Sequence, residues 1–417
     1  MKLSSKSNDY LVPEYSLTGD LLSFLTCNLQ YRYQNKGSLP PSTPVQLWFG
    51  EFIHGIMEEA FLKWDSLDEE EKSNFPWDWL EEIRPIEEMI DKRLQSRGLY
   101  PPTNFYCYNS HPTEKAYSCP DNLHPHKLLY SARAEAAINT WGPHLFPLIK
   151  DTELLIKSLR DMPENENRDN RSSYYSINGV VDVLSSIKLE DFKNNTNNKI
   201  FEYLKNNKEF LDKLNDLENS DKFEILETDE FEIIIDYKGM KRPSLDNKNW
   251  MYHEWQILTY AWLRSMKEDS KPVIGGIIFY LNELVPSTQD LIAIQKDYQF
   301  NKNNDFNTDV DISDKDFNII FNWNSEEDKP IHRDLSDKFK RDRSIRIIAI
   351  DDKIKKQSLE EFDNVVDKIE TSTLKEINGF SIKDSWKSNG EDRNCGACDF
   401  KNFCNKNEDL IKDIKIP

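Results

Sequence analysis

Two carboxylates and one lysine are the residues of this sequence whose types and spacing best suit chemistry. Asp182 lies in the β-branched run GVVDVL, and Asp236 and Lys238 stand two residues apart where the apolar run FEIIID ends. Side chains two residues apart on a strand point to the same side, so we expect Asp236 and Lys238 in one site and Tyr237 on the other face. Mg²⁺ and Mn²⁺ prefer oxygen ligands, and a neighbouring lysine can orient or deprotonate a water molecule. The set suits metal-dependent hydrolysis of a phosphodiester, although an Asp two residues before a Lys is also common as a solvated pair.

Polar residues at helical spacing could complete such a site. Gln256 and Tyr260 are four residues apart in the amphipathic run Trp250–Met266, so they share one helix face. A glutamine beside an apolar stripe needs hydrogen-bond partners when it is buried, which favours a polar site. His54 interrupts the helical apolar period of Pro44–Trp64, where it is either a satisfied core histidine or a metal ligand.

These segments resemble a known family. DYKGMKRP, which begins at Asp236, resembles the DYKTGK-type segment of RecB-like nucleases of the PD-(D/E)xK superfamily, and GVVDVL resembles their preceding strand. Gln256 and Tyr260 match the Q-x-x-x-Y helix of the family, the segment Phe49–Gly55 resembles its histidine-bearing helix, and Glu153 matches an acidic residue that often precedes the first core strand.

The resemblance implies a fold and a set of roles. The fold is a restriction-endonuclease-like α/β architecture, in which a mixed sheet is flanked by helices. His54, Asp182 and Asp236 would bind Mg²⁺ or Mn²⁺, with Glu153 as a weaker candidate ligand. Lys238 would be the catalytic amine, and Gln256 and Tyr260 would position Lys238 or the DNA backbone.

Four of the six cysteines form a second candidate site. Cys395, Cys398 and Cys404 lie within ten residues, and Cys27 lies near the other end of the chain. Four thiolates suit either a tetrahedral Zn²⁺ or an iron–sulfur cluster. SLTGDLLSFLTCNLQYRY, which contains Cys27, resembles the N-terminal segment of AddB-type and CRISPR-associated nucleases. That resemblance implies a [4Fe-4S] cluster that ties the two ends of the chain together, whereas Cys107 and Cys119 are expected to be ordinary thiols.

The elements that must position these residues follow from hydrophobic periodicity. Helices are expected over 44–64, 78–97, 127–141, 250–266 and 359–376, and strands over 174–185, 231–236 and 273–281. We expect a helical N-terminal region at 1–150, a nuclease core at 151–290 with a helical insertion at 188–225, and a C-terminal region at 291–417. Polar loops are expected over 98–125 and 298–316.

The charge of the chain bears on its partners. The formal net charge of −20 argues weakly against a polyanionic partner, because a local basic surface matters more than the total. Lys241, Arg242 and Lys248 lie near the active strand and are candidate DNA contacts. The basic run 338–346 could line a DNA groove or be a solvated helix face. No phosphate-binding loop of a motor protein is present, so unwinding would require a separate helicase or defence-complex subunit.

The sequence as a whole predicts a metal-dependent DNA exonuclease or endonuclease that acts on single-stranded DNA or DNA ends. Its pathway would be DNA repair and recombination, or antiviral defence of the CRISPR type. With no signal peptide and no apolar run long enough to cross a membrane, the protein is expected to be cytoplasmic. The alternative is a non-catalytic DNA-binding scaffold of a recombination or defence complex.

Overall fold

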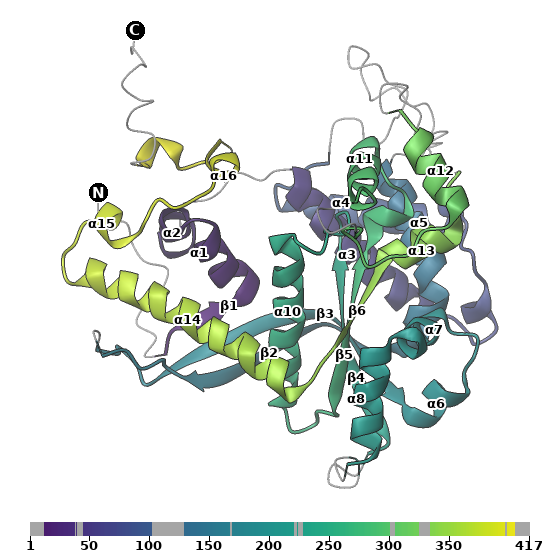
Figure 1. Cartoon of the computed structure of the whole chain (residues 1–417), viewed down its shortest axis with the longest axis horizontal. Coiled ribbons are helices and arrows are strands. Elements are labelled where there is room, and N and C mark those ends of the chain that lie inside the picture. The colour runs from purple at the N-terminus through teal and green to yellow at the C-terminus, as the bar shows by residue number, and fades with distance from the viewer. Residues whose placement is uncertain are drawn as a thin grey trace.

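The structure is a computed structural model, and Figure 1 presents it as a cartoon. It describes residues 12–37, 39, 45–101, 129–166, 169–220, 223, 228–300, 305–324, 334–396 and 398–404. Cys107, Cys119 and most of the loop expected over 98–125 lie outside the described residues.

A mixed β-sheet forms the centre of the molecule. Its strands are β1 (Glu14–Ser16), β2 (Ile149–Asp161), β3 (Tyr174–Lys188), β4 (Glu230–Lys238), β5 (Val273–Tyr280) and β6 (Ile345–Ala349). The order is β1-β3-β4-β5-β6, with β2 paired to β3 beside this path. The β4–β5 and β1–β3 pairs are parallel and the others are antiparallel. This mixed sheet with flanking helices confirms the restriction-endonuclease-like α/β fold class.

Strands β4 and β5 are buried along almost their whole length because helices cover both faces of the sheet. That explains why both read as continuous apolar runs rather than alternating ones. Gly275 and Gly276 of β5 let these helices approach closely. A Cβ at Gly275 would lie 2.7 Å from Phe210 Cε2 on one face, and a Cβ at Gly276 would lie 2.2 Å from Ile257 Cγ2 on the other.

One hydrophobic cluster joins the first face of the sheet to helices from the first half of the chain. These helices are α3 (Val45–Asp65), α4 (Arg84–Ser96), α5 (Leu129–Leu145), α6 (Leu189–Asn194), α7 (Lys199–Asn206) and α8 (Lys208–Glu218). The last three form the helical segment that was expected at 188–225. The regions expected at 1–150 and 151–290 therefore share one core.

A second cluster joins the opposite face to α10 (Lys248–Ser265), α14 (Asp352–Ile377) and the N-terminal segment. The N-terminal helices are α1 (Leu22–Thr26) and α2 (Asn28–Tyr31), and the C-terminal ones are α15 (Ile382–Ser385) and α16 (Asp392–Gly396). In Figure 1 the purple α1 and α2 lie beside the yellow C-terminal segment. A backbone hydrogen bond from Leu29 N to Lys387 O, 3.0 Å long, joins the two segments.

A third, smaller cluster contains α11 (Thr288–Asp297), α12 (Asp314–Asn322) and α13 (Asp337–Ser344). Strands β1, β2 and β6 and helices α11 and α12 were not expected from the sequence, and the polar loop expected over 298–316 includes the start of α12. Short helical turns complete the fold at Leu17–Leu21, Arg32–Lys36, Glu71–Ser73, Trp79–Ile83, Phe146–Leu148, Leu281–Leu284 and Lys401–Phe403. Among the described helices, none combines the length and the apolar character that a bilayer crossing needs.

Candidate active site

The antiparallel pairing of β3 with β4 brings the two predicted aspartates to neighbouring positions. Val183 pairs with Ile235, and since the two strands run in opposite directions, Asp182 before Val183 lies beside Asp236 after Ile235. Asp182 Oδ2 accepts a 2.8 Å hydrogen bond from the backbone N–H of Tyr237. The exposed fractions of Asp182 and Asp236 are only 9% and 2%. Both carboxylates are therefore recessed below the surface.

Lys238 lies on the same side as Asp236, as the two-residue period of a strand requires. The Lys238 Nζ atom is 2.7 Å from Asp236 Oδ2 and donates a 2.9 Å hydrogen bond to Gln256 Oε1. Tyr237 points into the other face, where its ring stacks on Phe279 with centroids 6.2 Å apart.

Gln256 connects the acid and the amine through the two ends of its amide. Its Oε1 accepts from Lys238, while its Nε2 donates to Asp236 Oδ1 at 2.9 Å and to the Tyr260 hydroxyl at 3.2 Å. An amide has one accepting end and one donating end, so it can hold an ammonium and a carboxylate at once. The Q-x-x-x-Y spacing on α10 thus fixes the orientation of both groups of the Asp236–Lys238 pair.

His54, Glu153 and Asp182 form a compact group of donor atoms. One atom from each lies within 4.8 Å of the others, and no other group of acid, histidine or cysteine side chains in the described residues has this spacing. His54 comes from α3, Glu153 from β2 and Asp182 from β3, with His54 Nδ1 3.3 Å from Asp182 Oδ2. Asp236 stands next to this group rather than within it.

Glu153 has an unusual backbone conformation. Its φ of +48° lies in the left-handed region, and it is the non-glycine residue with this property in the described chain. Glu153 precedes the strand expected over 174–185, but it lies in a strand of its own, β2, which was not expected from the sequence. Thr152 and Leu154 pair with Val183 and Val181, so Glu153 stands opposite Asp182. Strained residues of this kind gather at functional sites, where the surrounding structure holds them.

The pKa values show how the four charged groups influence one another. Burial opposes protonation of His54, but the charge of Asp182 and its hydrogen bond outweigh burial and raise the pKa of His54 to about 9. Burial likewise works against ionisation of Asp182, yet His54 lowers the pKa of that carboxyl overall. Burial, and then the charge of Asp182, raise the pKa of Glu153 to about 7. Burial raises the pKa of Asp236 to about 6 despite the neighbouring Lys238.

The donor set fits a divalent cation. One imidazole and two carboxylates converge, and repulsion between Glu153 and Asp182 is what a cation would relieve. Asp236 Oδ2 is buried and makes no hydrogen bond beyond its ion pair with Lys238. The carboxylate oxygens are ligands that Mg²⁺ and Mn²⁺ prefer, and His54 adds one nitrogen donor.

Two further residues, His253 and Tyr280, lie near Lys238 and were not predicted as site residues from the sequence. His253, on α10 three residues before Gln256, has its Nδ1 3.0 Å from the hydroxyl of Tyr280. Tyr280 is the β5 partner of Lys238. Burial, Lys238 and Arg346 lower the pKa of His253 to about 3, so this imidazole is neutral at pH 7. The helical spacing of His253 and Gln256 is the sequence signal that could have revealed it.

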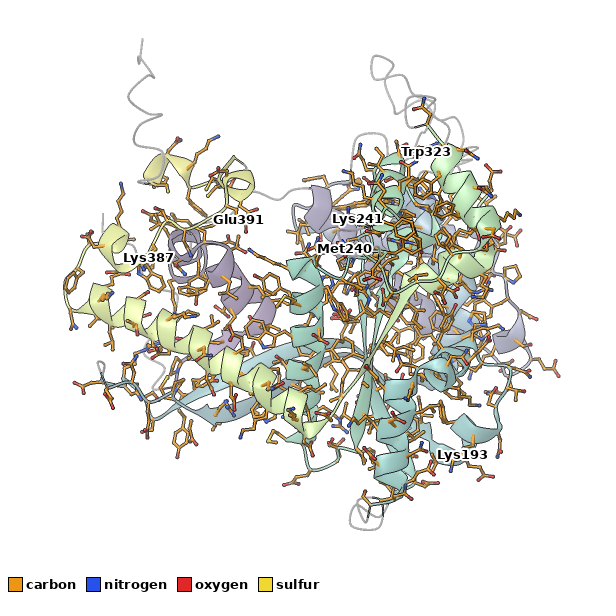
Figure 2. The ribbon with its side chains drawn as sticks, in the orientation of Figure 1. Lys193, Met240, Lys241, Trp323, Lys387 and Glu391 are labelled. Carbon is orange, nitrogen blue, oxygen red and sulfur yellow. The ribbon has the colours of Figure 1, made fainter. Side chains whose placement is uncertain are left out.

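The three basic residues expected to contact DNA lie in different environments. Lys241 is exposed, and it is labelled in Figure 2 on the loop that follows β4. Lys248 is exposed and forms a 2.9 Å ion pair with Glu391. Arg242 is buried, where its guanidinium pairs with Asp309 and donates to the backbone oxygen of Ile345. Arg242 is therefore not exposed for the DNA contact that was expected of it.

The basic run 338–346 divides between the surface and the interior. Lys338 and Lys340 form surface ion pairs with Asp342 and Asp337. Arg343 is fully buried between Glu283 and Asp297, and Arg346 pairs with Asp309. These arginines attach α13 and β6 to the rest of the fold.

The four cysteines Cys27, Cys395, Cys398 and Cys404 line one small cavity of about 20 Å³. Gly390 borders it, since a Cβ there would lie 3.4 Å from Cys27 Cβ and 3.4 Å from Cys395 Sγ. Among these described cysteines, no three sulfurs come within 4.8 Å of one another. Burial, with the charges of the other three thiols also contributing, raises the pKa of Cys398.

A known nuclease superfamily matches a large part of the chain that forms this site. Residues 224–405 match the sequence model of the PD-(D/E)XK nuclease superfamily. The matched segment contains Asp236, Lys238, Gln256 and Tyr260 and the three late cysteines, whereas His54, Glu153, Asp182 and Cys27 lie before it. No curated protein matches the chain. Over this segment the chain is therefore similar to the PD-(D/E)XK nuclease superfamily, which supports nuclease activity.

Proposed function

We propose that this protein is a deoxyribonuclease that hydrolyses phosphodiester bonds with Mg²⁺ or Mn²⁺ held by His54, Glu153, Asp182 and Asp236. The observation that carries the proposal is the meeting of the His54–Glu153–Asp182 group with the Asp236–Lys238 pair. The superfamily match over β4, α10 and β5 supports it independently.

Each residue has a role that follows from its contacts. When bound, a divalent cation would neutralise the phosphate and lower the pKa of the attacking water. The Tyr237 N–H and His54 hold Asp182 in place, so its carboxylate is oriented before a cation arrives. Lys238 presents its ammonium beside Asp236, where it stabilises negative charge that develops on the phosphate. Gln256 and Tyr260 are positioning residues for this pair.

The substrate that fits best is single-stranded DNA or a DNA end. Because Asp182 and Asp236 are almost fully buried, the phosphodiester must enter the molecule to reach them. A flexible strand can do so more readily than a rigid duplex. Exposed Lys241 and Lys248 supply phosphate contacts along the approach. The biological setting that we propose is repair and recombination or antiviral defence, with a separate helicase or defence-complex subunit as partner.

We further propose a [4Fe-4S] cluster at Cys27, Cys395, Cys398 and Cys404. A zinc ion binds sulfur at about 2.3 Å, which places tetrahedral sulfurs about 3.8 Å apart. The sulfurs here are more widely spaced, which favours a larger group than a single Zn²⁺. Such a cluster would join α2 to α16. The cluster is supported if the purified protein contains iron and acid-labile sulfide and if Cys398→Ser abolishes its visible absorbance. Stoichiometric zinc in the purified protein would instead identify a zinc site.

A digestion assay tests the nuclease proposal. Single-stranded and duplex DNA, labelled at either end and blocked at the 5′ or the 3′ end, is incubated with Mg²⁺, Mn²⁺ or a chelator. We expect cleavage that requires the metal and is faster on single strands. The blocked substrates separate exonuclease from endonuclease action. Metal-independent binding of DNA without cleavage would instead favour the non-catalytic scaffold.

A further inference from the structure

A groove between α3 and α4 opens onto the metal-binding group. It is a cavity of about 470 Å³, lined by Gly50, His54, Ile90, Arg93, Arg97 and Glu153 among others. His54 and Glu153 therefore belong both to this groove and to the group of metal donors. A molecule that occupies the groove reaches the metal site without crossing another element.

Two arginines of α4 and its C-terminal end line the groove. The side chains of Arg93 and Arg97 are 49% and 56% exposed, and they pair with Glu59 and Glu51 at 2.5 and 3.0 Å. Ion pairs at this exposure are weak, so a phosphate can replace the glutamate at little cost. Arginine is the side chain best suited to phosphate, because its planar guanidinium donates two parallel hydrogen bonds.

Acidic residues also face the groove, which limits what can bind there. Glu51, Glu58 and Glu153 lie along it, and burial together with the charge of Glu59 raises the pKa of Glu58. Arg93 and Arg97 offset part of this charge, and a cation at His54, Glu153 and Asp182 would offset more. The groove is thus suited to a phosphate chain only when the metal site is filled.

Two glycines of α3 shape the groove in opposite ways. A Cβ at Gly55 would lie 3.0 Å from Ile90 Cδ1, so this glycine lets α3 and α4 pack closely. A Cβ at Gly50 would meet nothing within 4 Å, although Gly50 also lines the groove. Gly50 therefore keeps space open where no packing contact requires it, at a helix position that an alanine would favour.

We propose that a single strand of DNA lies in this groove, with backbone phosphates on Arg93 and Arg97 and the scissile phosphodiester at His54, Glu153 and Asp182. The cavity is in the size range of small-ligand pockets, about 300–1,000 Å³, which admits a short stretch of flexible strand and excludes a duplex. This inference rests on the proposed nuclease function, and it assigns the path of the strand to α3 and α4.

The test measures binding separately from cleavage. A fluorescent twelve-nucleotide single strand is titrated in Ca²⁺, and the dissociation constant is measured at several salt concentrations. We expect the double variant Arg93→Gln/Arg97→Gln to bind about tenfold or more weakly, with the salt slope reduced by about 0.7 for each phosphate that the variant no longer neutralises. Lys193→Gln is the matched control, because Lys193 is 53% exposed, forms a similar surface ion pair and lies on α6 at the bottom of Figure 2.

A steric variant tests the same path in another way. Gly50→Trp should fill the groove and weaken strand binding at least as much as the arginine variant, whereas Gly50→Ala should bind within a factor of about two. Wild-type affinity in both Gly50→Trp and the double arginine variant would overturn the proposal, as would equal affinity for a blunt duplex. Hydrolysis of the small diester bis(4-nitrophenyl) phosphate by the wild type, and its absence in Asp236→Ala, tests the proposed nuclease function independently of the groove.

Discussion

Glu153 is the residue in which backbone strain and chemistry are most directly connected. Its φ lies in the left-handed region, and its carboxylate lies beside Asp182, whose charge adds to burial in raising the pKa of Glu153. Nothing in the sequence indicates this conformation, and only the family resemblance predicted Glu153 as a candidate metal ligand. Asp236 and Lys238, in contrast, were predictable as a pair because the period of a strand alone puts them on one side.

At this scale we predict that Glu153→Gly makes the protein more stable and the metal site weaker. Glycine adopts a positive φ without steric cost, and the substitution also removes repulsion with Asp182, so thermal unfolding should show a gain of about 1 kcal/mol. Calorimetric titration with Mn²⁺ should show a dissociation constant raised about tenfold or more. Glu153→Gln keeps the side-chain size but not the charge, so it separates the effect of backbone strain from that of repulsion with Asp182. A Glu153→Gly protein that is less stable than the wild type would contradict the argument from strain.

The burial of Arg242 could not be predicted from its position in the sequence. Its position four residues after Lys238 suggested a phosphate contact, but the chain folds it into a buried network with Asp309 and Arg346. Burial depends on residues that are about 70 to 100 positions away in the chain, and no local pattern reveals it.

At the scale of the elements, strand β3 and helix α10 approach each other closely at Gly179 and Tyr260. A Cβ at Gly179 would lie 2.4 Å from Cε1 of Tyr260, so this glycine of β3 allows the Tyr260 ring to approach the strand closely. The strand, helix and strand of β4, α10 and β5 were each predicted to within a few residues because their apolar periods are long. Strand β2 was missed, since its charged residues alternate with exposed leucines and give no clear apolar face.

We predict that Gly179→Ala displaces Tyr260 and, through Gln256, disturbs Lys238. Overpacking of this kind costs about 1–3 kcal/mol, which chemical denaturation can measure. The turnover number for a DNA substrate should fall more than the affinity, because the contacts of Lys238 matter in the transition state. In a double-mutant cycle, Tyr260→Leu should recover most of the missing stability by removing the ring that the new methyl group meets.

The control for this variant is Gly50→Ala, whose Cβ meets nothing within 4 Å. It should increase stability by roughly 0.5–1 kcal/mol, as expected when an alanine replaces a glycine within a helix. If Gly179→Ala were as stable as Gly50→Ala, the close packing of Tyr260 on β3 would be wrong.

At the scale of the whole molecule, ion pairs join segments that are far apart in the sequence. Glu370 of α14 receives hydrogen bonds from the Tyr15 hydroxyl and from Arg171, and Glu376 pairs with Arg32. The cysteine resemblance predicted that the N- and C-terminal segments meet, and the structure brings Leu29 and Lys387 together. These contacts were not predictable from the sequence, because nothing local identifies partners 199 to 355 residues apart in the chain.

We predict that Glu370→Gln destabilises the protein by about 3 kcal/mol, the lower end for breaking a buried pair, since Arg171 can still reach water. Burial works against ionisation of Glu370, but Arg171 lowers its pKa overall. A lowered folded-state pKa contributes stability above the unfolded-state pKa and loses it as the pH falls through the folded-state value. The variant should therefore be less stable at pH 7 and show a shallower loss of stability in acid.

Glu360→Gln is the comparison for Glu370→Gln, because Glu360 is 57% exposed and its ion pair with Lys356 is long, at 3.9 Å. It should change the free energy of unfolding by less than about 0.5 kcal/mol. Equal effects of the two substitutions would mean that the Tyr15–Arg171–Glu370 contact does not stabilise the junction between the N-terminal segment and α14.

The central claim is that the Asp236–Lys238 pair carries out metal-dependent cleavage of DNA. The most direct test is digestion of an end-labelled single strand in Mg²⁺ and Mn²⁺ by wild type, Asp236→Ala, Lys238→Ala and Lys193→Ala, purified in parallel and checked for folding by circular dichroism. We predict that the first two variants lose about 10²-fold or more of the activity while Lys193→Ala keeps it. Full activity in folded Asp236→Ala and Lys238→Ala would contradict the account.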